Sequence, residues 1–339
     1  MVLLGEIMKD NSISYLRVFS LLCIILCHFF QAYESKLAFW FNIGVQVFVF
    51  ISGFLYGKKK IDNFDDFFKK RIKRVLIPYY IYLFFAFIYY FIFKPEYINF
   101  SLALKAIAGL QVFGDSINGL GHLWFVPVIM ICYFLTPIIQ TLYNNIKKYN
   151  DFHFLLIILF IVICLQLLLL FPHVGYEIPV NLSVYLIAYI LSRRMMDKNI
   201  SLKKLQFCLV IFIFIGISFS LIKIFVCDNA FFSNFGIIKY LNIITHYKCI
   251  FISISIFLLF YIFGKKTKLF LNTNKFIDFF DNYSYYIYLT HLIYILGPSS
   301  LINFSSYNLI NYILIIILII ISSVVLKYIC DIISKFLDW

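Results

Sequence analysis

Residues 11–33 have the sequence NSISYLRVFSLLCIILCHFFQAY, an apolar stretch that contains Arg17 and His28. A run of about 20 mainly apolar residues is long enough to cross a bilayer as a helix. Arg17 and His28 are 11 residues apart. That spacing is about three helical turns, so the two side chains share one face, roughly 16 Å apart along the axis. Because ionisable side chains are costly inside a membrane, this pair is the first candidate functional site.

The composition of the whole chain is that of an integral membrane protein. Of the 339 residues, 63% are hydrophobic and 13% charged, and the mean hydropathy is +0.94. Soluble domains carry about 25% charged residues. The apolar segments are near the length of a membrane helix, whereas membrane barrels show weaker alternating segments of about ten residues. We therefore expect an all-α integral membrane protein, a single helical bundle over residues 1–339.

Ten apolar segments are candidate membrane spans. They lie near residues 12–33, 37–57, 76–93, 121–142, 152–171, 178–192, 205–226, 247–264, 283–298 and 309–330. With a cytoplasmic N-terminus, 22 of the 29 Lys and Arg residues fall inside, six fall outside, and Arg17 lies within a span. Because cytoplasmic loops are rich in Lys and Arg, this asymmetry predicts that both termini are cytoplasmic. The same rule explains the net charge of +13, so we expect membrane lipids and no nucleic acid as partners.

The eight cysteines lie mostly within apolar segments, without a CxxC pair or the spacing of a zinc site. We expect them to be small core residues and expect no metal. Cys23 and Cys27 are one helical turn apart and close to His28 in the sequence, which leaves a metal site there as a minor alternative.

His28 is the candidate general base. Burial biases an imidazole toward its neutral form, which accepts a proton near neutral pH. The alternative is that His28 is a hydrogen-bonded packing residue and that Arg17 is an interfacial anchor. The shared helical face favours a functional role.

A basic segment, FFKKRIKR at residues 67–74, precedes Pro78. On a helix, Arg71 and Arg74 project from one side and form a pair of guanidinium groups suited to phosphate. On charge alone, the general excess of Lys and Arg in cytoplasmic loops, or contact with anionic lipid, explains the segment better than phosphate binding does. Pro78 fits the first turn of the next helix.

Three further segments carry candidate residues. GVQVFVFISGFL at 44–55 contains Gly44, Ser52 and Gly53, which favour close helix packing. GHLWFVP at 121–127 offers His122 and Trp124 to a sugar, although an interfacial aromatic belt is an equal alternative. YYIYLTH at 285–291 places Tyr288 and His291 in the ninth span, where His291 requires a partner or a cavity.

Taken together and in this order, these segments resemble the acyltransferase 3 family of bacterial integral membrane enzymes. The matching residues are Arg17 and His28 with ten residues between them, then Gly44 to Phe54, Arg71 to Arg74 with Pro78 and Tyr79, His122 to Phe125, and Tyr288 to His291. The resemblance implies an acyl-CoA-dependent O-acyltransferase of the bacterial cytoplasmic membrane, with about ten spans. Its acyl group is most often acetyl from acetyl-CoA, and its acceptor is a sugar hydroxyl of a surface polysaccharide or of a lipid-linked precursor.

The resemblance also implies roles for single residues. His28 matches the catalytic histidine, which Arg17 supports, and Arg71 and Arg74 match the pair that holds acyl-CoA on the cytoplasmic side. Substrate binding is then expected from His122, Trp124, Tyr288 and His291. Family members often carry an acidic residue three positions before the arginine, where this chain has Ser14. A carboxylate that orients His28 must then come from elsewhere, with Glu34 and Asp115 as candidates.

The alternative function is a transporter or flippase for a lipid-linked glycan, since such proteins also carry Arg and His inside the membrane. A glycan polymerase usually has a large external loop, and the longest predicted external connection, residues 94–120, is short. A scaffold in the cell envelope does not explain Arg17 and His28.

Overall fold

The computed structural model describes residues 11–170, 175–198, 200–227, 241, 246–266 and 274–336. Every regular element in these ranges is helical, and they contain no strand, which confirms the all-α prediction. Residues 1–10 and 337–339, the two ends of the chain, lie outside the described ranges, and the prediction that both termini are cytoplasmic stays a prediction.

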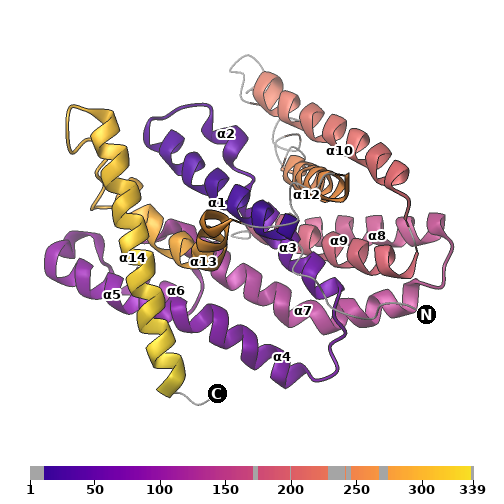
Figure 1. Ribbon diagram of the computed structural model, residues 1–339, viewed down its shortest axis with the longest axis horizontal. Helices are drawn as coiled ribbons and strands as arrows, with labels where there is room; N and C mark the ends of the chain where they lie inside the picture. Colours follow the sequence, from indigo (N-terminus) through magenta and orange to yellow (C-terminus); the bar gives the residue numbers. More distant parts are fainter. Residues whose placement is uncertain are drawn as a thin grey trace.

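The helices follow one another with short connections (Figure 1). The α-helices are α1 (Asn11–Ala32), α2 (Ala38–Phe41), α3 (Gly44–Gly57), α4 (Phe64–Arg71), α5 (Ile77–Phe93), α6 (Phe100–Ile107), α7 (Phe125–Ile146), α8 (Asp151–Gln166), α9 (Glu177–Asp197), α10 (Leu202–Ile222), α12 (Lys248–Lys266), α13 (Lys275–Ile295) and α14 (Asn308–Phe336). The 3₁₀-helical turns are η2 (Pro95–Tyr97), η3 (Gln111–Phe113), η4 (Gly121–Trp124) and η5 (Leu167–Leu170). The π-helical turns are η1 (Ile72–Leu76) and η6 (Lys223–Cys227).

Seven helices among the described residues are long and apolar enough to cross a membrane. They are α1, α2 with α3, α4 through α5, η4 with α7, α10 with η6, α12 and α14. The three remaining predicted spans are also helical, as α8, α9 and α13. However, α8 has 16 residues, α9 ends in charged residues, and α13 carries Asp278 and Asp281. A multi-pass helical membrane protein is therefore confirmed, and the number ten stays a prediction.

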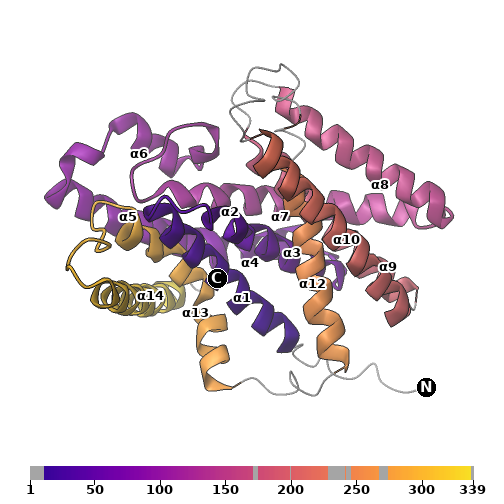
Figure 2. The ribbon, with the colours of Figure 1, turned by 90° about the horizontal axis from the view of Figure 1, so that it is seen from above.

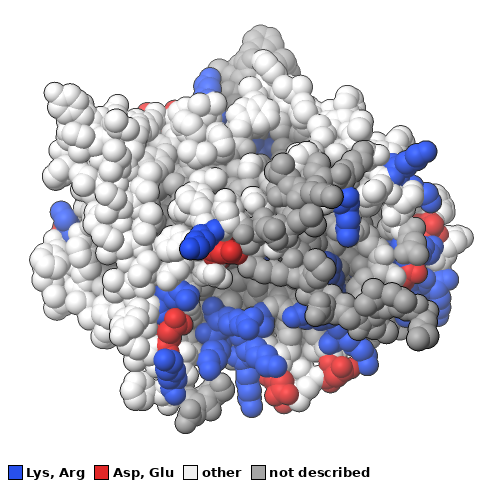
Figure 3. All heavy atoms as spheres, viewed as in Figure 1, with Lys and Arg blue, Asp and Glu red and all other residues white. Residues whose placement is uncertain are grey.

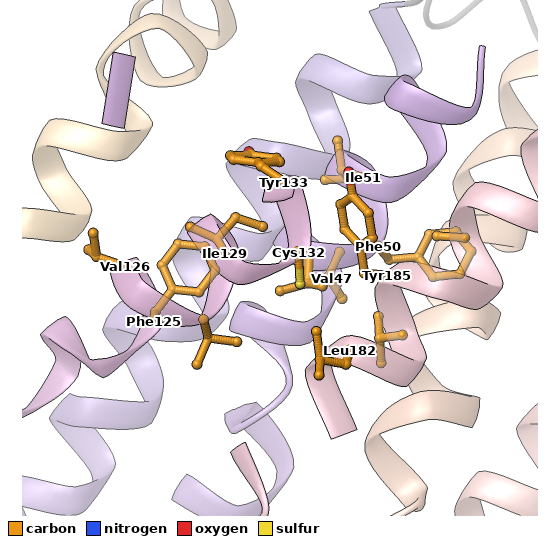
Figure 4. Close-up of a cluster of buried hydrophobic side chains, with 14 of the residues drawn as sticks. Val47, Phe50, Ile51, Phe125, Val126, Ile129, Cys132, Tyr133, Leu182 and Tyr185 are labelled. Atoms are coloured by element: carbon orange, nitrogen blue, oxygen red, sulfur yellow. The ribbon is translucent and has the colours of Figure 1, made fainter. Parts of the chain in front are cut away.

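Helix α3 lies at the centre of the molecule and packs along α9. A Cβ atom on Gly53 would lie 2.5 Å from the Tyr185 carbonyl oxygen, and one on Gly57 would lie 2.6 Å from that of Tyr189. Because both glycines lack a side chain, the two helix backbones approach closely. Val47, Phe50 and Ile51 of α3 then pack among Cys132 and Tyr133 of α7 and Leu182 and Tyr185 of α9, all of them buried (Figure 4).

Helix α1 packs against both α3 and α13. The Ser20 hydroxyl donates to the Gly44 carbonyl, and a Cβ atom on Gly44 would lie 2.6 Å from the Ile24 side chain. Gly44 and Gly53 are thus the close-packing residues that the sequence predicts. Helices α5, α13 and α14 lie on one side of this centre and α8, α9, α10 and α12 on the other (Figures 1 and 2).

The chain from α4 to α5 forms one long helix with a π-helical turn, η1, in its middle. The Asn63 side chain accepts from the Asp66 N–H and caps α4. Pro78 lies in the first turn of α5, as predicted, and supplies no N–H to the preceding turn. The Ile77 N–H bonds the Ile72 carbonyl five residues back, which is the π-helical pattern. Proline therefore gives a local reason for the wider turn.

Lys and Arg side chains gather at the bottom of the view in Figure 3, where α4 and the C-terminal end of α14 lie in Figure 1, and along its right edge. The exposed side chains of Lys59, Lys60, Lys69, Lys70 and Arg74, which lie in α4 or next to it in the chain, are here called the basic face. Such a one-sided distribution is typical of the cytoplasmic side of a membrane protein.

Candidate active site

A cavity of about 430 Å³, here called the arginine cavity, opens among α1, α3, η1, α7 and α13. Its volume is in the range of small-molecule sites. Its cationic lining consists of Arg17, Lys59, Arg71 and Arg74. Apolar and aromatic side chains form most of the remaining wall, including Phe48, Tyr56, Phe125, Tyr133 and Tyr285. Four cations around an otherwise apolar cavity favour an elongated ligand that is anionic at one end.

Arg71 and Arg74 both line this cavity but differ in their surroundings. The Arg71 guanidinium lies 4.9 Å from the ring centre of Tyr56 and 5.8 Å from that of Tyr133, and its Nε is buried with no hydrogen-bond partner among the described residues. Arg74 is exposed. Arg71 ends α4 whereas Arg74 lies in η1. The two arginines therefore line one cavity from different surroundings, Arg71 at the end of α4 and Arg74 in the π-helical turn.

Arg17 is held by a carboxylate from a distant part of the chain. Its Nη1 lies 2.9 Å from Oδ1 of Asp281 on α13. The Ser14 hydroxyl donates to the other carboxylate oxygen, Oδ2, at 2.7 Å. The Asp281 side chain is only 4% exposed. The Ser14 hydroxyl and the Arg17 guanidinium thus bind the two oxygens of one carboxylate. Arg17 lines the arginine cavity and has no contact with His28 in the structure.

A second, smaller cavity of about 50 Å³, here called the histidine cavity, lies at the other end of α1. Its lining includes Cys27, His28, Asn42, His122 and Trp124. It shares Ile24, Val45 and Tyr288 with the arginine cavity. The two cavities therefore meet at these three side chains.

The hydrogen-bond partner of His28 is Gln31, one helical turn further along α1, at 2.7 Å from Nδ1 to Oε1. An amide oxygen only accepts, so Nδ1 carries the hydrogen and Nε2 keeps its lone pair. Glu34 and Asp115, the predicted carboxylate candidates, are exposed and do not bond His28 in the structure. Gln31 is therefore the group that fixes the tautomer of His28.

Three imidazole rings come together in this region. The ring centre of His291 lies 5.1 Å from that of His28 and 4.8 Å from that of His122. His122 donates from Nε2 to the Leu289 carbonyl, and His291 donates from Nδ1 to the Tyr288 carbonyl. The other nitrogens, His122 Nδ1 and His291 Nε2, are buried without a partner among the described residues. His291 lines neither the arginine cavity nor the histidine cavity. Its ring packs against those of His28 and His122.

One of the predicted substrate-binding groups, the Tyr288 hydroxyl, already has a partner. It donates to the His122 carbonyl, which ties α13 to η4. Within the described residues, no group of three or more His, Cys, Asp or Glu side chains is arranged to hold a metal ion. All eight cysteines are free thiols, and five of them are buried.

Sequence reasoning alone missed Asp281 and Gln31. Asp281 has a detectable signal, a carboxylate in the helix that also carries Tyr288 and His291, but its partner is 264 residues away in the chain. Gln31 lies three residues after His28, and residues three apart on a helix are neighbours, so this contact can be found from the sequence.

A sequence model of the acyltransferase domain that defines the acyltransferase 3 family matches residues 10–332 of the chain. The resemblance found in the motifs is thereby confirmed over nearly the whole length. Searches of curated proteins and of solved structures found no match.

Proposed function

Because the chain belongs to the acyltransferase 3 family, we propose that this membrane acyltransferase transfers a short acyl group from acyl-CoA to a sugar hydroxyl of a surface polysaccharide or of its lipid-linked precursor. The observation that carries the proposal is the meeting of the arginine cavity and the histidine cavity at Ile24, Val45 and Tyr288. The arginine cavity offers cations to the phosphates of acyl-CoA, and the histidine cavity offers a base near the thioester at the other end of the same long molecule.

The donor binds in the arginine cavity in this proposal. Arg71 and Arg74 contact the phosphates of CoA, with Lys59 at the same end, and the pantetheine arm runs past Arg17 between apolar walls. The unpartnered Nε of Arg71 supports this assignment, because a buried donor without a partner is costly until a ligand accepts from it. The thioester then reaches Tyr288 and the histidine cavity.

Acyl transfer takes place at His28. Its Nε2 removes the proton from the acceptor hydroxyl as the hydroxyl oxygen attacks the thioester carbonyl. A carbon–oxygen bond forms, the carbon–sulfur bond breaks, and the CoA thiolate takes the proton back from His28. Asn42 and Trp124 carry N–H donors in the same cavity and are the candidates for holding the oxyanion.

The small volume of the histidine cavity, about 50 Å³, favours a short acyl group such as acetyl. His122 and Trp124 then contact the acceptor, while Tyr288 and His291 hold the rings in place. No metal takes part in this chemistry as we propose it.

The chain crosses the bacterial cytoplasmic membrane ten times in this proposal, as one domain with both termini cytoplasmic. Support comes from helices at all ten predicted spans and from the basic face at the end of the molecule where Lys59 and Arg74 line the arginine cavity. Acyl-CoA made in the cytoplasm would therefore enter from that face.

The test is an assay of purified protein in lipid nanodiscs with acetyl-CoA and a neutral glycan acceptor. Release of free CoA that depends on the acceptor, together with an acetylated glycan in the mass spectrum, supports the enzyme. Movement of a fluorescent lipid-linked glycan across the bilayer without any CoA release would instead support the transporter.

A further inference from the structure

A third cavity, here called the Glu177 cavity, adjoins the proposed reaction site. It measures about 430 Å³ and is lined by Gln111, Val112, Phe113, Gly114, Ser116, Gly121, Trp124, Gly175 and Glu177. Trp124 also lines the histidine cavity, and Gly121 precedes His122 in η4. The turn η4 therefore borders both cavities through Trp124. A ligand in the Glu177 cavity would place one end at Trp124, beside the cavity of the proposed base.

We infer that the Glu177 cavity binds the acceptor, and that the acceptor is an uncharged sugar unit. This inference rests on the proposed function, because it takes His28 as the place where the acyl group is transferred. The volume is in the range of ligand pockets. Three glycines, at positions 114, 121 and 175, leave room along the wall where side chains would otherwise project.

Gln111 gives the cavity a fixed hydrogen-bond acceptor. Its side-chain nitrogen donates to the Tyr79 hydroxyl at 2.6 Å and to the Ala106 carbonyl at 3.3 Å. Its Oε1 is buried without a partner among the described residues, and the residue is only 6% exposed. Because the nitrogen is held on both sides, the amide is fixed in place. A ligand hydroxyl that donates to Oε1 would satisfy a group that is otherwise left unpaired.

The remaining polar groups suit sugar hydroxyls. The Glu177 carboxylate accepts charge-assisted hydrogen bonds, the Ser116 hydroxyl donates or accepts, and the Trp124 ring offers a flat apolar face to a sugar ring. Glu177 is the charged side chain among the residues that line the cavity, and Lys105 reaches the rim at Gly114 without lining it. A carboxylate disfavours an acidic sugar by like-charge repulsion. The cavity therefore selects neutral sugars over uronic acids.

The first test compares three acceptors: methyl glucoside, methyl N-acetylglucosaminide and methyl glucuronide. With wild-type protein and acetyl-CoA, we expect a kcat/KM at least about tenfold lower for the glucuronide than for the better neutral glycoside, the discrimination that about 1.4 kcal/mol provides. Equal use of the glucuronide, or failure of all three glycosides while CoA is still released, would overturn the inference.

The second test changes the carboxylate. Glu177→Gln should raise the KM for the neutral glycoside about tenfold and reduce the discrimination against the glucuronide. Gly175→Ala keeps the charge but displaces the carboxylate, because a Cβ atom on residue 175 would overlap Glu177 Oε2. It should therefore also raise the acceptor KM. Glu96→Gln, at an exposed glutamate outside the cavity, is the matched control.

A measurement of acetyl-CoA affinity distinguishes failure of the proposed function from failure of the acceptor inference. We expect Glu177→Gln and Gly175→Ala to bind acetyl-CoA like the wild type. If wild-type protein does not bind acetyl-CoA at all, the proposed function fails. If it binds acetyl-CoA and acylates the glycoside, but Glu177→Gln and Glu96→Gln behave alike, only the acceptor inference fails.

Discussion

Arg17 on α1 and Asp281 on α13 form an ion pair, with 2.9 Å between Nη1 and Oδ1, that joins two helices far apart in the chain. Both helices supply residues to the proposed reaction site, His28 from α1 and Tyr288 from α13. The pair therefore holds the N-terminal parts of these helices together while the histidines meet further along them. In the proposed mechanism, Arg17 supports His28 in this way without touching it.

Replacing Asp281 with Asn should destabilise the protein by about 1–3 kcal/mol, because a charged hydrogen-bond acceptor for Arg17 and Ser14 is lost from a buried position. The exposure of Arg17, 32% of its side chain, keeps the cost below that of a fully buried ion pair. Thermal unfolding in detergent measures the change. Asp331→Asn, at the more exposed pair with Lys327, should cost about 0.5 kcal/mol or less. Equal effects of the two variants would contradict the role given to Asp281.

Gln31→Ala should lower the turnover roughly 10- to 100-fold, as loss of the outer partner of a functional histidine does. The physical reason is that His28 Nδ1 loses its acceptor and the imidazole is free to take the wrong tautomer. Acetyl-CoA affinity should not change.

Gln31→Glu should give a different result. A carboxylate next to His28 stabilises the imidazolium form. The base must be neutral, so the limb of the pH–rate profile on which activity rises with pH should move to higher pH. An unmoved profile would show that Gln31 does not act through His28.

Arg71→Lys should weaken acetyl-CoA binding more than Arg74→Lys does. Lysine at position 71 loses both the guanidinium fork and the contacts with Tyr56, Phe67 and Tyr133. Arg74 is exposed, and its attraction for phosphate is screened by salt. Titration calorimetry at low and high salt should show a loss of about tenfold for Arg71→Lys at both, and a smaller, salt-dependent loss for Arg74→Lys. Arg194→Lys, at an ion pair with Asp151, is the control.

Gly53→Ala should destabilise the protein by about 1–3 kcal/mol, the usual cost of forcing an extra group into a packed core. The added Cβ atom meets the Tyr185 backbone, so α3 and α9 must separate. Thermal unfolding is the measurement. Ser52→Ala adds no atom at the neighbouring position and removes only the hydroxyl to which Tyr133 donates at 3.5 Å, so it should cost about 1 kcal/mol or less. A neutral Gly53→Ala would argue against the close crossing.

The sequence was sufficient for what depends on local pattern. Apolar length predicts the helices, and the small residues Gly44 and Gly53 predict the close crossings. The three-turn spacing of Arg17 and His28 on α1 predicts that their side chains share one face. Pro78 predicts the start of α5 but not the π-helical turn before it, because that turn depends on how the preceding carbonyls are satisfied.

The sequence does not specify which residues far apart in the chain contact one another. Asp281 reaches Ser14 and Arg17 through the contact between α1 and α13, and His291 comes to lie near both His28 and His122 only after three elements have packed. The Glu177 cavity likewise joins η3, η4 and the start of α9. These relationships follow from the packing of the bundle.

The most direct test of the account is to compare His28→Ala with wild-type protein in two measurements, acetyl-CoA affinity and acceptor-dependent CoA release. We predict an affinity unchanged within about twofold and a turnover lower by about 10²- to 10⁴-fold, the usual contribution of a general base. Wild-type turnover in His28→Ala would contradict the assignment of His28 as the base.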